Sequence, residues 1–120
     1  MFVISVDVLL YRRYDARHYN CAHFVVEAWE YLFGQSISDK MHGFLCSIKE
    51  RKVSFGLRRD FFPLSKPKSP CLVWMSRIGY PPHVGIFLRG RILHIQNSGP
   101  VFQSVYLATL GFKKIRYYSC

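Results

Sequence analysis

Hydrophobic residues recur at helical spacing just after residue 20, and acidic residues lie between them. The apolar stripe consists of Cys21, Phe24, Val25, Ala28 and Leu32. Asn20 is a favoured N-cap residue, because its side-chain oxygen can accept a backbone N–H of the first turn. Gly34 is typical of the residue that follows the C-terminus of a helix. The pattern predicts an amphipathic helix that begins after Asn20 and ends before Gly34, with a cysteine in its first turn.

Beyond Pro70 the pattern changes to short apolar runs that are separated by turn residues. The expected strands form a small antiparallel meander over residues 71–77, 83–88, 91–96, 101–105 and 115–118. Arg89 and Gly90 fit a two-residue hairpin connection between the second and third of these strands. A helical half followed by a strand half predicts the α+β fold class, in a single domain that spans residues 1–120.

The other segments are less regular. Residues 2–11 are rich in β-formers and are compatible with a strand or a loosely packed arm, and residues 11–18 are an expected loop. Apolar residues at helical spacing predict a second helix over residues 39–52. Three prolines in residues 53–70 predict a surface connection.

The composition narrows the class of protein. Half of the 120 residues are hydrophobic, and no apolar run reaches the length of a membrane span. The N-terminus lacks a basic region before its apolar residues, so we expect no signal peptide and synthesis in the cytoplasm. The cysteines show no CxxC spacing, so neither a disulfide framework nor a zinc site is expected, and no cofactor. The four cysteines are Cys21, Cys46, Cys71 and Cys120.

The formal net charge of +10 predicts attraction to polyanions such as nucleic acid, anionic lipid or acidic cell-wall polymers. The cations are scattered along the chain, and no DNA-reading motif accompanies them. A solvated basic surface is the plainer interpretation.

Cys21 and two histidines carry the candidate chemistry. A thiol at a helix N-terminus feels the positive end of the helix dipole, which favours the nucleophilic thiolate. Cysteine catalysis also needs an imidazole and a third polar group that orients it. In a hairpin centred on Arg89 and Gly90, His83 and His94 become diagonal neighbours. We expect Gly85 to leave room for the helix to pack on its strand.

Three segments of the chain resemble the NlpC-type cell-wall peptidases, which are papain-like cysteine hydrolases of bacteria and bacteriophage tails. The similar segments are Tyr19-Asn20-Cys21-Ala22-His23-Phe24-Val25, His83-Val84-Gly85-Ile86-Phe87-Leu88 and Ile92-Leu93-His94, preceded by a matching strand at Pro70-Cys71-Leu72-Val73-Trp74. The resemblance covers roughly residues 19–96, and the order and spacing of its motifs make it fairly specific. It implies a papain-like NlpC-type fold, with N-terminal helices packed on a small antiparallel sheet.

The resemblance also implies roles for individual residues. Cys21 would be the nucleophile, His83 the general base and acid, and His94 the group that orients His83 and favours its charged form. Tyr19 and Asn20 would contact substrate, and the backbone N–H of Cys21 would stabilise the oxyanion. The implied reaction is hydrolysis of an amide in peptidoglycan stem peptides through a thioester. A virion-associated or tail-associated role would fit the small size.

The chain departs from the family pattern at Asn20, Ala22 and His23, where the family has Asp, Ser and Gly. In bacterial members the Asp and Ser help to recognise a free amino end of the stem peptide, so the resemblance does not imply a preference for that end here.

Three alternatives stay open. The block Asn20-Cys21-Ala22-His23-Phe24-Val25 is also similar to the lecithin:retinol acyltransferase family, whose papain-like core is circularly permuted. This similarity implies a lipid or thioester acyl hydrolase or acyltransferase on the same core. A catalytically inactive basic adaptor is the second alternative. Within the site, Gln96 and Asn97 are substitutes for His94, because a one-residue change of register turns every side chain to the other face.

Overall fold

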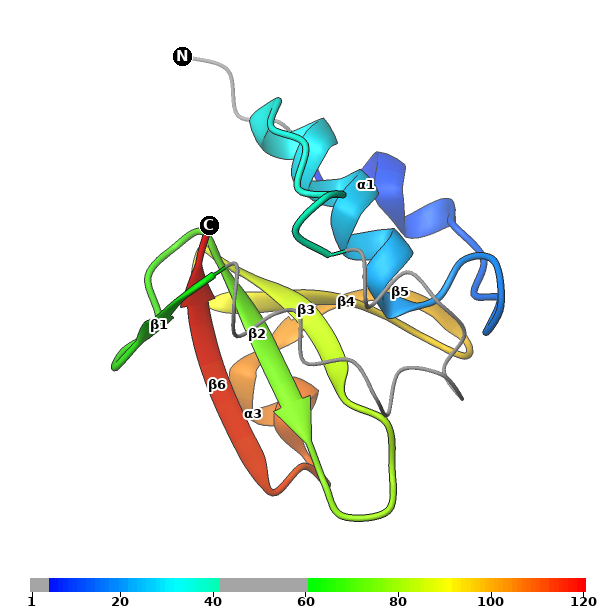
Figure 1. Ribbon diagram of the computed structural model, residues 1–120. Coiled ribbons are helices and arrows are strands. Elements are labelled where there is room, and N and C mark those ends of the chain that lie inside the picture. The colour runs from blue at the N-terminus through cyan, green and yellow to red at the C-terminus, as the bar shows by residue number, and fades with distance from the viewer. Residues whose placement is uncertain (1–4, 42–60) are drawn as a thin grey trace.

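The computed structural model describes residues 5–41 and 61–120 and has an α+β architecture (Figure 1). The helices are η1 (Asp7–Tyr11, a 3-10 helix), α1 (Cys21–Phe33) and α3 (Val105–Thr109). The strands are β1 (Phe62–Leu64), β2 (Cys71–Ser76), β3 (His83–Leu88), β4 (Arg91–Gln96), β5 (Gly99–Ser104) and β6 (Lys114–Ser119). The six strands form one antiparallel sheet in the order β1-β6-β2-β3-β4-β5. In the described part of the chain, no helix is long and apolar enough to cross a membrane.

The predicted helix and the central hairpin are confirmed. Helix α1 begins directly after Asn20 and ends at Phe33, where Gly34 adopts a φ of 70° and donates its N–H to Glu30. Strands β3 and β4 have the predicted bounds, and the two residues that join them have φ values of 50° and 80°. Positive φ at both positions is the geometry of the tight turn that matches the twist of paired strands. The predicted strand at β2 is one residue too long at its end, and those at β5 and β6 differ from the observed strands by one or two residues at each end.

Five sequence predictions need correction or lie partly outside the described residues. Residues 7–11 form the 3-10 helix η1 and not a strand. The chain turns into α3 at residue 105, because the hydroxyl of Ser104 caps the N–H of Leu107 at 3.2 Å. The strands do not form a simple meander, since β6 lies between β1 and β2. The helix predicted over residues 39–52 lies outside the described residues from position 42 onward. The surface connection predicted over residues 53–70 is described only from residue 61, and this part of it contains the strand β1.

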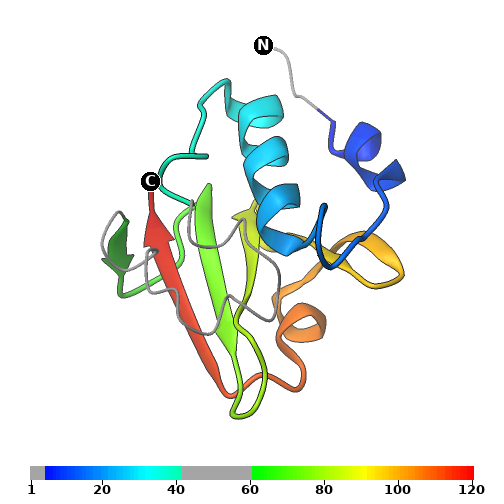
Figure 2. The same ribbon diagram turned by 45° about the vertical axis from the view of Figure 1, so that its right-hand side comes forward.

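Two apolar layers enclose the sheet, one under α1 and one under α3. Strand alternation directs Leu72 and Trp74 toward α1, and Val73 and Met75 toward α3. Figures 1 and 2 show the two helices on opposite faces of the sheet. Since β2 is covered on both faces, every residue from 71 to 75 is buried, and the strand is a continuous apolar run without alternation of polarity.

Candidate functional site

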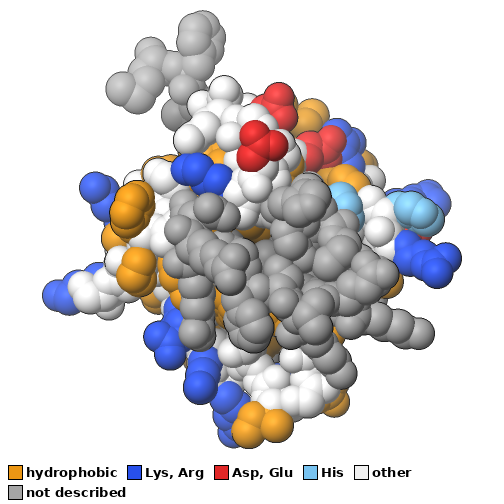
Figure 3. Space-filling model, viewed as in Figure 1, with side chains coloured by type: hydrophobic (Ala, Val, Ile, Leu, Met, Phe, Trp, Pro, Cys, Tyr) orange, Lys and Arg blue, Asp and Glu red, His pale blue; other side chains and the backbone are white. Residues whose placement is uncertain are grey.

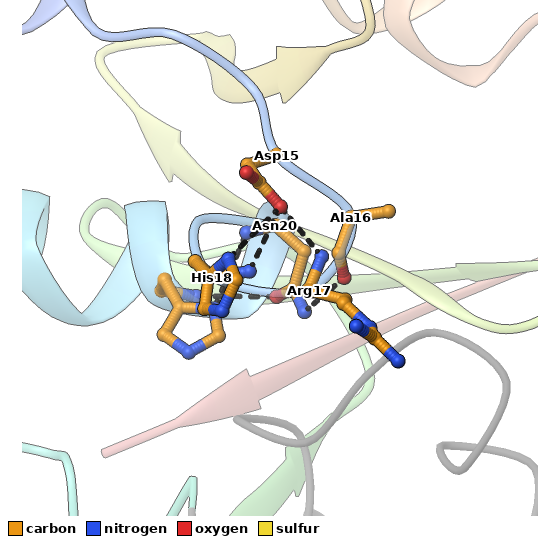
Figure 4. Close-up of polar contacts among 6 residues, drawn as sticks. Asp15, Ala16, Arg17, His18 and Asn20 are labelled. Atoms are coloured by element: carbon orange, nitrogen blue, oxygen red, sulfur yellow. Dashed lines mark hydrogen bonds and ion pairs between the residues drawn. The ribbon is translucent and has the colours of Figure 1, made fainter.

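The two ends of the loop before α1 are hydrogen-bonded to each other, and these bonds fix the position of the helix N-terminus. The backbones of Asp15 and Tyr19 exchange two hydrogen bonds, of 3.0 and 2.8 Å. The carboxylate of Asp15 accepts the N–H groups of Arg17 and His18 at 2.9 and 3.1 Å (Figure 4). These local bonds lower the pKa of Asp15. The predicted loop is therefore a tight turn that ends directly before Asn20.

Asn20 caps α1 through a reciprocal pair of hydrogen bonds with His23. The Asn20 side-chain oxygen accepts the N–H of Ala22 at 3.0 Å and that of His23 at 3.4 Å, and His23 Nδ1 accepts the N–H of Asn20 at 3.2 Å. The amide nitrogen of Asn20 donates to the carbonyl of Ala16 at 3.4 Å. The side chain of Asn20 is fully buried. It thus supports the helix start, and its predicted contact with substrate stays a prediction.

Cys21 is the first residue of α1 and is 2% exposed. It belongs to the apolar layer between α1 and the sheet, together with the next helical residues on the same stripe. The three described cysteines, Cys21, Cys71 and Cys120, form no disulfide with one another.

His83 and His94 are hydrogen-bonded to each other on neighbouring strands. The distance from His83 Nε2 to His94 Nδ1 is 2.8 Å, and the ring planes meet at 78°. The predicted diagonal arrangement in the hairpin is therefore observed. The register pairs His83 with Met75, and His94 lies two residues after Ile92 on β4, so both imidazoles lie on the face of the sheet that α3 covers. The ring of His83 stacks on Phe112 with centroids 5.8 Å apart.

Gln103 extends the histidine pair into a chain of three side chains. Its Oε1 lies 2.9 Å from His94 Nε2. Because an amide oxygen only accepts, His94 Nε2 carries the proton and Nδ1 of the neutral ring accepts. His83 Nε2 must then donate, which leaves Nδ1 as the basic nitrogen of a neutral His83. Gln103 thus selects the tautomers of both rings.

His94 is held in its neutral form. Burial, and then the adjacent His83, lower the pKa of His94 to about 4, and the hydrogen bond to Gln103 opposes both effects. Its side chain is 2% exposed. At neutral pH His94 is therefore a dipolar hydrogen-bond acceptor for His83 and carries no charge of its own.

Gly85 leaves room for the neighbouring strand β4 and its His94, whereas the sequence predicted that it leaves room for the helix. A Cβ at this position would lie 3.0 Å from Ile92 Cγ2, 3.1 Å from His94 Cβ and 3.1 Å from the carbonyl oxygen of Leu93. All three atoms belong to β4. The missing side chain lets β4 place His94 close to β3, on the face opposite α1.

Cys21, His83 and His94 line one cavity of about 420 Å³. The cavity lies where β3 begins and β4 ends, and the β2–β3 turn and the segment from α3 to Phe112 also contribute to its wall. The other described residues that line it are Tyr14, Arg77, Tyr80, Pro81, Pro82, Ile95, Gln96, Asn97, Leu107, Ala108, Leu110 and Phe112. A volume of this size is within the range of sites that bind small substrates.

Tyr19 does not line this cavity, whereas Tyr14 does. The Tyr19 hydroxyl donates to Glu27, whose carboxylate also accepts Arg12 Nε at 2.7 Å. Burial, and then the hydrogen bond to Glu27, raise the pKa of Tyr19, while the hydrogen bond from Arg12 lowers the pKa of Glu27. The structure thus ties Tyr19 to α1 and to the segment after η1, and its predicted contact with substrate stays a prediction.

The structure therefore places the three residues predicted to be catalytic at one cavity, and Tyr19 is not among the residues that line it. Sequence reasoning did not find Gln103, Tyr14 or Arg77. The signal for Gln103 was available in the tight turn at residues 97–98, because that turn pairs Ile92 with Gln103 and makes Gln103 a diagonal neighbour of His94. Arg77 and Tyr14 lie in irregular segments, where no periodicity indicates what they face.

In the described ranges, no three His, Cys, Asp or Glu side chains gather as metal ligands. Comparison of the chain with protein-family models, with curated proteins and with solved structures finds no match.

Proposed function

We propose that this protein is a papain-like cysteine hydrolase that cleaves a peptide amide through a Cys21–His83–His94 site. The observation that carries the proposal is the hydrogen-bonded pair of His83 and His94 in the cavity that Cys21 also lines. A thiol at a helix N-terminus, an imidazole, and a neutral acceptor that orients the imidazole are the groups that thiol catalysis requires. The leading substrate class is the peptidoglycan stem peptide, which rests on the family resemblance.

The proposed reaction has two steps, which are the formation of a thioester on Cys21 and its hydrolysis. His83 Nδ1 removes the proton of Cys21, and Sγ attacks the carbonyl carbon of the amide. When the C–N bond breaks, the amine leaves with the proton from His83, and a thioester remains on Cys21. Water then attacks the thioester carbon and gives its proton to His83, the C–S bond breaks, and the thiol is restored. The backbone N–H of Cys21 is the proposed donor to the oxyanion.

His94 and Gln103 support the proposed role of His83. As a neutral acceptor, His94 Nδ1 holds the N–H of His83 Nε2 and so keeps Nδ1 available as the base. This bond also stabilises the protonated form of His83 that arises in each step. Gln103 and His94 are thus positioning residues in this proposal, since they act through His83.

The test is turnover of purified stem peptides by the wild-type protein and by Cys21→Ala, with products identified by mass spectrometry. Cys71→Ala is the matched control, because Cys71, on β2, is also buried and is not among the residues that line the cavity. We expect activity in the wild type and in Cys71→Ala, none in Cys21→Ala, and a thioester adduct on Cys21 after acid quenching. Hydrolysis that survives in Cys21→Ala would refute the mechanism, and a wild type without turnover would favour the adaptor.

A lipid or thioester acyl hydrolase on the same core is the second candidate. It is supported by the exposed apolar side chains at the cavity, since Tyr80, Leu107 and Leu110 each expose more than half of their surface. Such side chains would contact an acyl chain. Incubation with short-chain and long-chain thioesters separates the candidates, because only the lipid hydrolase should prefer the longer chain.

A further inference from the structure

We infer that the cavity selects peptides that carry a carboxylate beside the scissile amide, and that Arg77 is the residue that recognises it. This inference rests on the proposed hydrolase function and names the charge of its substrate. Among the described residues that line the cavity, Arg77 is the only one with a fixed charge, and no Asp or Glu lies among them.

The guanidinium of Arg77 is held in place while its donors stay available. Its central carbon lies 3.7 Å from the centroid of the Tyr80 ring. The same turn is closed by a backbone hydrogen bond of 3.3 Å from the Tyr80 N–H to the Arg77 carbonyl. Stacking covers one face of the guanidinium and leaves the N–H groups at its edge for a carboxylate. The described residues include no carboxylate that forms an ion pair with Arg77.

The charge of the surrounding structure favours the same ligand. Residues 61–120, which form the whole sheet and α3, contain no Asp or Glu. The cations of this half are Lys66, Lys68, Arg77, Arg89, Arg91, Lys113, Lys114 and Arg116. In Figure 3 the acidic side chains lie toward the top, near α1, and the coloured side chains of the lower part include Lys and Arg but none that is acidic. A cavity bounded largely by a half of the protein that lacks acidic side chains attracts anions and disfavours amines.

The first experiment measures binding and does not need turnover. Three peptides that differ only in Glu, Gln or Lys before the scissile amide are titrated into Cys21→Ala by calorimetry. We expect the Glu peptide to bind about fivefold more tightly than the Gln peptide, and the Lys peptide to bind most weakly. Arg77→Gln in the same background should abolish the advantage of the Glu peptide.

Arg91→Gln is the matched control. Arg91 is also an exposed arginine over an aromatic ring, with its guanidinium 5.8 Å from the Phe102 centroid, and it does not line the cavity. The same loss of charge at Arg91 should leave the preference intact. Equal affinities for the three peptides, no binding of any of them, or a Glu preference that survives Arg77→Gln would each overturn the inference.

Turnover by the wild type then separates this inference from the proposed function. Selective binding without cleavage of any peptide would refute the hydrolase and leave the recognition by Arg77 standing. Cleavage of all three peptides with equal kcat/KM would refute the recognition and leave the hydrolase standing. We expect kcat/KM to follow the order of the affinities.

Discussion

Acid should destabilise this protein through the buried imidazole of His94. Burial and the neighbouring His83 lower the pKa of His94 to about 4 in the folded protein, against 6.5 for an exposed histidine. The unfolded chain therefore binds this proton more readily than the folded one, and stability rises with pH between these values. The contribution of His94 is fully present above pH 6.5 and is lost as the pH falls through 4. At 1.36 kcal/mol for each pKa unit, the whole effect is about 3 kcal/mol.

The assay is urea unfolding at pH 7 and pH 4.5, for the wild type and for His94→Gln, which cannot titrate in this range. We expect the wild type to lose about 2.5 kcal/mol more than the variant between the two conditions. The carboxyl groups with lowered pKa values, Asp15 and Glu27, also reduce stability at low pH, but they are present in both proteins and cancel in the difference.

NMR titration of the His94 ring in the folded protein provides an independent check, with an expected midpoint near 4. Equal losses of stability in the wild type and in His94→Gln, or a midpoint near 6.5, would show that His94 is not held neutral. The tautomer assignment made through Gln103 would then lose its basis.

Three further substitutions test how the site is supported. Asn20→Ala removes the cap of α1 and should lower the free energy of unfolding in urea by about 1–2 kcal/mol. Asn20→Asp keeps an accepting oxygen and should lower it less. Equal losses of stability in the two variants would contradict the capping role. Gly85→Ala should cost about 1–3 kcal/mol, because the new Cβ meets β4 atoms at 3.0–3.1 Å, and unchanged NMR shifts of His94 would argue against this crowding. Gln103→Leu leaves a buried N–H of His94 without its acceptor, so we expect a loss of about 1–3 kcal/mol and a further lowered His94 pKa. Gln103→Glu, which keeps an accepting oxygen, should restore the His94 pKa, and identical titrations of the two variants would refute the role of Gln103.

The elements that local patterns specify were predictable from the sequence. A cap at Asn20, an apolar stripe and Gly34 define α1, and the Arg89–Gly90 turn defines the central hairpin with its residue pairs. The diagonal placement of His83 and His94 follows from that turn alone, because a two-residue connection permits one register. Helix α3 was missed because it is five residues long, and a serine cap with one turn leaves little periodicity.

The partners of polar side chains were harder to predict, because they depend on packing between distant segments. The sequence did not indicate that the hydroxyl of Tyr19 donates to Glu27 on α1. The sequence also did not indicate that the ring nitrogen of His23 accepts the N–H of Asn20 and so completes the cap of α1. In each case the hydrogen bond satisfies a group that packing removes from water, and a linear pattern does not specify which acceptor will be nearest.

The sequence by itself determined the helix that presents Cys21, the hairpin that pairs the two histidines, and the segregation of acidic residues into the N-terminal half. Only the tertiary structure decided that both imidazoles lie on the α3 face of the sheet and that Gln103 selects the tautomers of the two rings. It also decided that Arg77 and Cys21 line the same cavity. The reason is the range of the interactions involved. Caps, turns and periodicity act between residues close in sequence, whereas burial, tautomer choice and the charge within a cavity arise where separate elements meet.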